Sequence, residues 1–284
     1  MLNCLVILIP FLKLIMPPID SFWVKPIKEA IDDKLLDMIT AENKHNILSE
    51  IKSYVQELLD YCPVASEKEF QEAVLDEYGV LYSADGRKLI KGNDDLKSYI
   101  IKPGTEIICD NAFKDCSLLG AINIPDSIRT IGHSAFCRCY ALRSILLPES
   151  IKEIGTSVFW FCNQLNFVAF PSIKYLPSDI FVGCGLKEFE IPNTIRIIKS
   201  SSFASCNFKH IDIPPMVHTI ENRAFFNCKN LESITFKRNE LKKVGYDVFK
   251  QCDKLHSIYV PKIFKGHYIE VFKDIDPIKI IGYT

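Results

Sequence analysis

Cysteine is the residue whose number and spacing in this chain most suggest chemistry. The 284 residues include 11 cysteines, and cysteines can form disulfides, bind metals or act as nucleophiles. Cys137 and Cys139 resemble half of a metal site, but no matching cysteine or histidine pair follows them at zinc-ligand spacing. The six histidines are also scattered without metal-ligand spacing. We therefore expect no metal site and no cofactor.

Catalytic motifs are missing as well. The sequence has no glycine-rich phosphate loop, no nucleophile elbow and no carboxylate pair in a recognisable frame. A core cysteine beside a chance histidine would be a poor nucleophile, because apolar surroundings raise the pKa of a thiol. We expect no catalytic residue, no small-molecule substrate and no enzymatic activity.

The cysteines instead occupy one position of a repeat. Seven of them follow a phenylalanine by three residues, in the pairs Phe113/Cys116, Phe136/Cys139, Phe159/Cys162, Phe181/Cys184, Phe203/Cys206, Phe225/Cys228 and Phe249/Cys252. Phe272 continues the series, with Ile275 in the place of the cysteine. A period in the low twenties predicts a solenoid of stacked repeats. The seven cysteines then share one inward slot, where parallel side-chain directions disfavour disulfides and favour buried, reduced thiols.

Each repeat also carries a strand signal. Leu142, Ile145 and Leu147 have the spacing L-x-x-I-x-I, whose last two apolar residues alternate as a strand requires, and Pro148 ends the strand. From the first apolar residue to the proline position, all eight units keep the same length, whereas insertions and deletions fall elsewhere. A slip of one residue would turn every side chain to the wrong face. The pattern predicts eight parallel strands in one sheet over residues 96–262.

These units resemble the BspA-like class of leucine-rich repeats, which read roughly L-x-x-I-x-I-P-x-x-I-x-x-I-G-x-x-A-F-x-x-C. The A-F pair occurs at Ala112-Phe113, Ala135-Phe136 and Ala224-Phe225, and the I-G pair at Ile131-Gly132, Ile154-Gly155 and Val244-Gly245. The glycine is missing after Leu176, Ile198 and Ile220, which we expect to change only local turns. The resemblance covers about residues 78–284. It implies an α/β solenoid that binds other molecules, often at the surface of bacteria or parasitic protozoa and in adhesion.

The chain is expected to have five parts. These are an apolar N-terminal segment (1–25), a helical extension (26–77), a β-hairpin cap that leads into the repeats (78–95), the solenoid (96–262) and a C-terminal cap (263–284). Residues 2–16 are strongly apolar but shorter than the roughly 20 residues that span a bilayer. A signal peptide, an anchoring helix and a structured or mis-started segment all stay open for them. Membrane association is expected through residues 1–16 only. The resemblance favours a surface or secreted protein, with a cytoplasmic one as the alternative.

The helical extension has two interpretations. Ile27, Ile31, Leu35 and Ile39 recur at a spacing of four, which is typical of an amphipathic helix. Further along, Ser66 and Glu69 form a capping-box signature for a short helix. The helices would either cover the first repeat or oligomerise. In the second case the protein would be an intracellular structural scaffold.

Charge excludes one class of partner. The formal net charge is −1, from 34 basic and 35 acidic residues, so no overall field attracts nucleic acid. The one basic cluster, Lys237, Arg238, Lys242 and Lys243, falls on a turn between repeats. We interpret it as a solvated turn.

The expected partner is a protein, and the expected site is the outward side of the sheet. Large apolar groups occur there at Leu146 and Phe167, where the pattern requires none. Three acids, Glu188, Glu190 and Asp212, follow in the next two repeats. His210 and Tyr259 complete the predicted partner-binding set. The sequence thus predicts a non-catalytic module for protein–protein interaction or adhesion.

Overall fold

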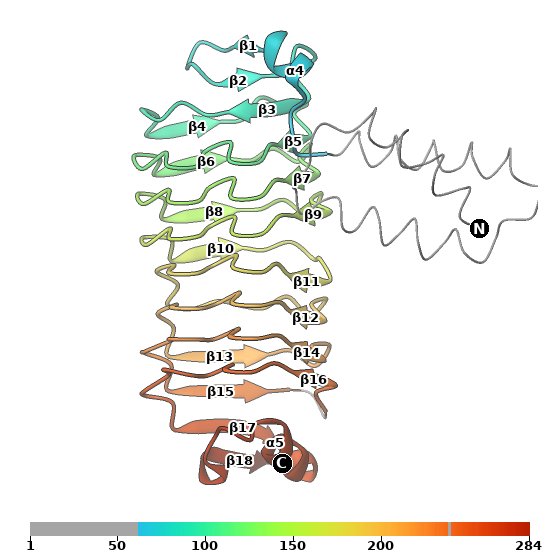
Figure 1. The fold of residues 1–284 in the computed structure, drawn as a ribbon, viewed down its shortest axis with the longest axis vertical. Coiled ribbons are helices and arrows are strands. Elements are labelled where there is room, and N and C mark those ends of the chain that lie inside the picture. The colour runs from blue at the N-terminus through green and yellow to red at the C-terminus, as the bar shows by residue number, and fades with distance from the viewer. Residues whose placement is uncertain (1–61, 238–239) are drawn as a thin grey trace, which may run out of the picture.

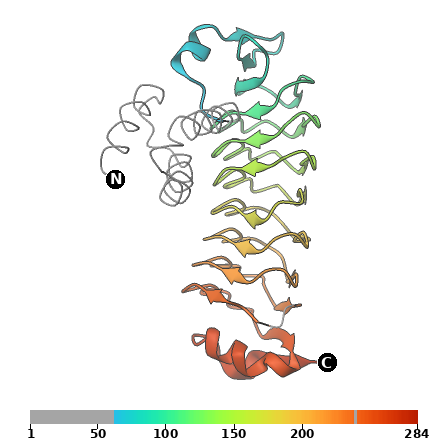
Figure 2. The same cartoon turned by 90° about the vertical axis from the view of Figure 1, so that its right-hand side faces the viewer.

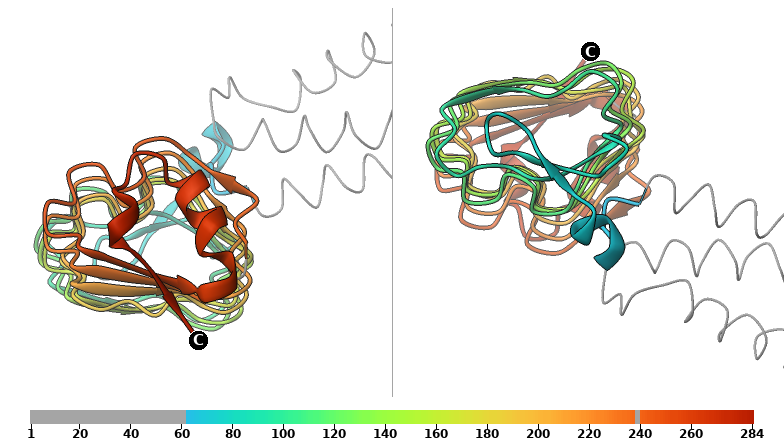
Figure 3. Two further views of the ribbon diagram at one scale, coloured as in Figure 1. Left: turned by 90° about the horizontal axis from the view of Figure 1, so that it is seen from below. Right: turned by 90° about the horizontal axis from the view of Figure 1, so that it is seen from above.

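The structure is a computed structural model that describes residues 62–237 and 240–284. These residues form an elongated solenoid whose coils stack along the long axis (Figure 1). Viewed from either end, the coils superimpose around one shared interior (Figure 3). The apolar N-terminal segment and the helices expected before residue 62 lie outside the described residues. No helix in the described part of the chain is long and apolar enough to cross a membrane.

One side of the solenoid, which we call the strand face, carries the predicted parallel strands. They are β4 (Ser98–Ile100), β6 (Ala121–Asn123), β8 (Ser144–Leu146), β10 (Phe167–Ala169), β13 (His210–Ile213), β15 (Ser233–Phe236) and β17 (Ser257–Pro261). Where neighbouring strands pair, they are parallel and keep the predicted register, with Ile145 opposite Val168 and Ile211 opposite Ile234. The stacked parallel strands are therefore confirmed.

The prediction of one continuous eight-stranded sheet is wrong. The strand face divides into β4-β6, β8-β10 and β13-β15-β17-β18, and residues 188–190 form no strand. The turn before that coil, Cys184 to Leu186, is one residue shorter than in most repeats, but the next turn, Cys206 to Phe208, is equally short and is followed by β13. A Cβ on Gly185 would lie 2.4 Å from the carbonyl oxygen of Asn163, so this short turn packs closely on the preceding coil.

A second ladder of short strands, which the sequence did not predict, lies on another side of the coils, as Figure 2 shows in a turned view. It consists of β5 (Ile107–Ile108), β7 (Thr130–Ile131), β9 (Glu153–Ile154), β11 (Tyr175–Leu176), β12 (Ile197–Ile198), β14 (Thr219–Ile220) and β16 (Lys243–Val244). The I-G glycines explain the close stacking here. A Cβ on Gly155 would lie 2.6 Å from the amide nitrogen of His133. The ladder is interrupted between β9 and β11, where the run of glycine-lacking units begins.

Turns around each phenylalanine make a third ladder of backbone hydrogen bonds. In the coil of Phe159, Ser157 and Phe161 both adopt φ of 57°, so every second amide points toward the next coil. The amides of Ser157, Phe159 and Phe161 donate to the carbonyls of Ser178, Ile180 and Val182 at 3.0, 3.0 and 2.7 Å. Backbone hydrogen bonds thus link neighbouring coils on up to three sides.

Phenylalanines and cysteines form the core between these ladders. The seven repeat phenylalanines stack in one column, with ring centroids 5.3–5.7 Å apart from Phe113 to Phe249. The seven repeat cysteines are buried in one slot, as predicted. Each thiol from Cys139 to Cys252 donates to the carbonyl of the repeat phenylalanine in the preceding coil; for Cys162 the acceptor is Phe136, at 3.0 Å. The ten cysteines of the described residues are all unpaired, and their reduced state in the cell stays a prediction.

The N-terminal end is covered by a small cap. Helix α4 (Glu67–Gln71) begins with the predicted capping box of Ser66 and Glu69. Strands β1 (Val74–Leu75), β2 (Leu81–Tyr82) and β3 (Lys88–Lys91) pair antiparallel, so the hairpin is confirmed. Since β3 pairs with β5, the hairpin extends the second ladder and not the strand face.

The C-terminal end closes the core differently. Residues 262–264 form a 3₁₀ turn, η1 (Lys262–Phe264), followed by α5 (Lys265–Val271), whose Tyr268 is fully buried. Phe272 packs on Phe249 with ring centroids 5.3 Å apart. It therefore occupies the next position in the column of phenylalanine rings, but its ring is turned edge-on to that of Phe249. After η2 (Pro277–Lys279), strand β18 (Ile280–Tyr283) adds in parallel to β17.

Candidate protein-binding surface

The strand face presents its outward side chains in two rows. Register places Ser144 beside Phe167 in one row and Leu146 beside Ala169 in the other. Leu146 is 64% exposed and Phe167 is 54% exposed. Ile100, which the prediction did not select, is 72% exposed and occupies the same outward position as Leu146 two repeats earlier. We call these three residues the apolar patch.

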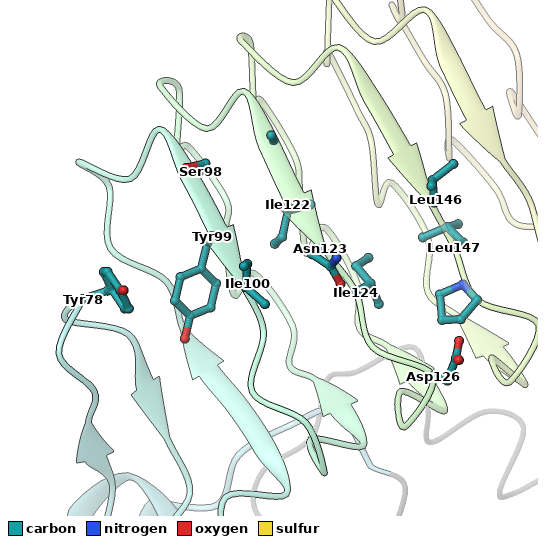
Figure 4. Close-up of a pocket in the computed structure, with 12 residues that line it drawn as sticks. Tyr78, Ser98, Tyr99, Ile100, Ile122, Asn123, Ile124, Asp126, Leu146 and Leu147 are labelled. Carbon is teal, nitrogen blue, oxygen red and sulfur yellow. The ribbon is translucent and has the colours of Figure 1, made fainter.

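A hollow of about 680 Å³ lies on the N-terminal part of this face. Tyr78, Tyr99, Ile100, Asn123 and Leu146 are among the residues that line it, and Figure 4 shows Tyr78 and Tyr99 at one end. It lies where β6 and β8 are not paired. Two members of the apolar patch thus border a depression that side chains of a partner could enter. The position of Tyr78, before β2, gave no sequence signal for a place in this site.

The hydroxyl of Tyr99 is fixed by its neighbours. It donates to a carboxylate oxygen of Asp76 and lies 2.7 Å from the hydroxyl of Tyr82. Burial, together with these two hydrogen bonds, raises the pKa of Tyr99 far above its usual range. The ring at the end of the hollow is therefore neutral and rigidly placed.

The three predicted acids do not act as one group. Asp212 accepts a bond from Lys237 at 2.6 Å and contacts the Nε2 of His210 at 2.8 Å. Partial burial opposes ionisation, but these hydrogen bonds hold the pKa of Asp212 below its usual value. The other imidazole nitrogen of His210 lies 2.8 Å from the Ser233 hydroxyl. Asp212 and His210 thus belong to a local polar network.

Glu188 and Glu190 are different. Both are exposed, and neither forms an ion pair with any residue in the described ranges. They occupy the coil next to Phe167 and Ala169. Tyr259, in β17, is half-buried and lies three coils beyond Glu190, about 14–15 Å away at the usual strand spacing. The structure therefore brings Leu146 and Phe167 close to the Glu188/Glu190 pair, whereas Ile100 and Tyr259 lie three or more coils away from it.

The thiols offer no reactive group on this surface. Burial raises the pKa of Cys139 and Cys162 well above the usual value, and it raises that of Cys116 to about 12. Within the described residues, no cluster of histidine, cysteine and acidic side chains could hold a metal ion. What the face can do chemically is to bury apolar groups and attract positive charge.

Parallel strands on one side, and a buried phenylalanine and cysteine in every coil, define a leucine-rich repeat protein. The family model described as BspA type leucine rich repeat region matches six copies, over residues 87–206 and 166–279. The match covers more than half of the chain, so the chain belongs to this family. Repeats of this family are in general non-catalytic interaction modules.

Several solved structures are similar to this chain. A leucine-rich repeat protein of T. pallidum is 24% identical, with 73% of this chain and 95% of that chain covered and a TM-score of 0.54. A leucine-rich repeat protein of Bacteroides ovatus is 23% identical over 66% of this chain and 62% of that one, with a TM-score of 0.43. The pneumococcal vaccine antigen PcpA is 21% identical over 76% and 49%, with a TM-score of 0.41. This chain spans less than two thirds of the length of the last two. A search of curated proteins found no significant match.

Proposed function

We propose that this protein is a non-catalytic module for protein–protein interaction or adhesion, and that the strand face is its binding surface. The observation that carries the proposal is the exposure of Leu146 and Phe167 on adjacent strands of a rigid scaffold. Neither side chain is needed outside, since a small or polar residue such as Ser144 or Ala169 fits the same outward rows. Large apolar groups on a surface mark interaction sites, and a few of them carry most of the binding energy.

The rigidity that the three hydrogen-bond ladders give the scaffold also supports the proposal. Because every coil is hydrogen-bonded to its neighbours, the outward side chains are held in fixed positions and lose little backbone freedom on binding. The nearby hollow offers concave surface beside the patch. A partner could therefore bury Leu146 and Phe167 together.

The test is affinity capture of cellular proteins on the full chain, followed by measurement of the affinity of the captured partner. Phe167→Ala should weaken binding by about 2 kcal/mol, or roughly thirtyfold. The matched control is Ile263→Ala, because Ile263 is 84% exposed but lies in η1, away from the patch. Circular dichroism should show unchanged folding for both variants. A partner that binds the Phe167 variant as tightly as the wild type would overturn the proposal.

A further inference from the structure

The strand face has an uneven distribution of charge. Its outward positions are Ser98, Ile100, Ala121, Asn123, Ser144, Leu146, Phe167, Ala169, Glu188, Glu190, His210, Asp212, Ser233, Thr235 and Tyr259, while Ser257 continues one row but is buried. None of these residues is lysine or arginine, although the chain has 34 of them. The basic residues nearest to the rows, such as Lys97, Arg143 and Lys209, lie at the edge where the chain enters each strand. No row position supplies a positive charge, although Lys237, which follows β15, reaches onto the face and bonds Asp212. The face therefore presents a net negative charge.

The negative charge available to a partner is concentrated at Glu188 and Glu190. Asp212 is already bonded to Lys237, whereas neither glutamate has an ion-pair partner in the described residues. Both carboxylates also belong to the coil that forms no strand, and residues 188–190 make no backbone hydrogen bond to the flanking strands. Two unpaired carboxylates thus lie on a segment that can adjust to a ligand.

The distances from Leu146 and Phe167 to the two glutamates indicate how the side chains of a ligand should be spaced. Phe167 and Glu188 occupy corresponding outward positions in adjacent coils, about 5 Å apart at the usual strand spacing, and Leu146 and Glu190 are about twice as far apart. Side chains on one side of an extended segment recur every 6–7 Å or so. An apolar side chain seated on Phe167 would therefore place the next side chain of the same row near a glutamate.

We propose, building on the function proposed above, that the partner of the strand face is an extended protein segment in which an apolar side chain is followed two residues later by a lysine or arginine. The apolar group packs on Leu146 and Phe167, and the cation approaches Glu188 and Glu190. Complementary charge selects such a segment over an acidic one and speeds its association. Because both carboxylates are exposed, this selectivity depends on ionic strength, with a screening length of about 10 Å at 0.1 M salt.

The test uses the full chain and three short fluorescein-labelled peptides. In the first, pairs of leucines alternate with pairs of lysines, so that a leucine and a lysine follow each other on the same side of the extended segment. In the second, pairs of leucines alternate with pairs of glutamates; in the third, pairs of serines alternate with pairs of lysines. Fluorescence anisotropy at low and high salt gives the affinities. We expect the leucine–lysine peptide to bind more tightly than either of the others. The double variant Glu188→Gln, Glu190→Gln should weaken its binding about fivefold at low salt and hardly at all at high salt.

Two further variants separate the possible failures. The control double variant Glu67→Gln, Glu270→Gln removes the same charge from exposed glutamates off the strand face, and it should bind like the wild type. Phe167→Ser should weaken binding of both leucine-containing peptides. If Phe167→Ser weakens binding but the Glu188/Glu190 variant does not, the present inference is wrong and the proposed function stands. If neither change affects binding, both are wrong. An equal loss with the control variant would also overturn the inference, since it would show a nonspecific charge effect.

Discussion

Replacing Phe159 by alanine should destabilise the solenoid more than the same change at its end. Phe159 is fully buried, and its ring stacks on Phe136 and Phe181 with centroids 5.7 Å away on either side. A buried Phe→Ala change costs about 3–5 kcal/mol, and an aromatic pair adds about 0.5–1.5 kcal/mol beyond burial. The three ladders around the coil prevent collapse into the cavity. We therefore expect a loss of about 5 kcal/mol in the free energy of unfolding.

Phe249 provides the matched comparison. It stacks on Phe225 on one side, but on the other side Phe272 meets it edge-on, at 63° between the ring planes. Phe249 is also slightly exposed, and the short cap beyond it can relax. Phe249→Ala should then cost about 3 kcal/mol, near the low end of the range for this substitution.

Urea denaturation followed by circular dichroism measures both losses, and hydrogen exchange shows where each variant opens. Because stability in a solenoid passes from neighbour to neighbour, Phe159→Ala should uncouple the two halves and broaden the transition. Phe249→Ala should increase exchange only near the C-terminal end. The reasoning would be refuted if Phe159→Ala cost less than Phe249→Ala, or if exchange increased evenly along the chain.

Three further predictions concern single positions in the core. Cys162→Ala should lower the free energy of unfolding by about 1–2 kcal/mol, measured by urea denaturation, because it removes buried volume and the thiol hydrogen bond to the carbonyl of Phe136. The loss stays small because that carbonyl still accepts a hydrogen bond from the amide of Cys139. Burial raises the pKa of Asp110 to about 6, so its contribution to stability is complete below about pH 4 and is lost as the pH rises through 6. Asp110→Asn should therefore raise the free energy of unfolding at pH 8 by at most about 3 kcal/mol and leave it unchanged near pH 3, as measured by urea denaturation at both pH values; a gain at low pH would contradict this sign. Gly155→Ala should cost about 1–3 kcal/mol in the free energy of unfolding because its Cβ would meet the backbone of the preceding coil at 2.6 Å, whereas Gly266→Ala, with no atom within 4 Å, should not.

The sequence predicted the parts of the fold that repeat without variation. The constant spacing of Leu142, Ile145 and Leu147 sets both the strand and its register, and the Phe-x-x-Cys spacing sets the core column. It could not predict the second ladder, because strands of two residues such as Glu153–Ile154 are too short to leave an alternating pattern. The glycines beside them were interpreted as bends, and their role in close stacking becomes visible only when the neighbouring coil is present.

The candidate site was predictable to a similar extent. Alternation alone shows that Leu146 and Phe167 face outward. The ion pair between Asp212 and Lys237 could not be predicted from the sequence, because Lys237 occupies the proline position of the next coil and was interpreted as part of the solvated turn. The loss of the strand at 188–190 was equally hidden, since Phe189 and Ile191 fit the frame of every other unit.

The irregular coil also suggests why an interaction surface would lie where it does. Regular coils satisfy their backbone groups through their neighbours, so a change at an outward position such as Ala169 leaves the hydrogen bonding of the coil intact. In the coil of Glu188 and Glu190 the strand pairing is absent, while Phe189 and Ile191 still fill the core. The apolar core is therefore intact in this coil, but the backbone at the surface forms no strand. Residues 188–190 are therefore held in place by buried side chains, while their backbone is not hydrogen-bonded to the flanking strands and can adjust locally. Such a segment suits charged groups that contact a partner beside a rigid apolar patch.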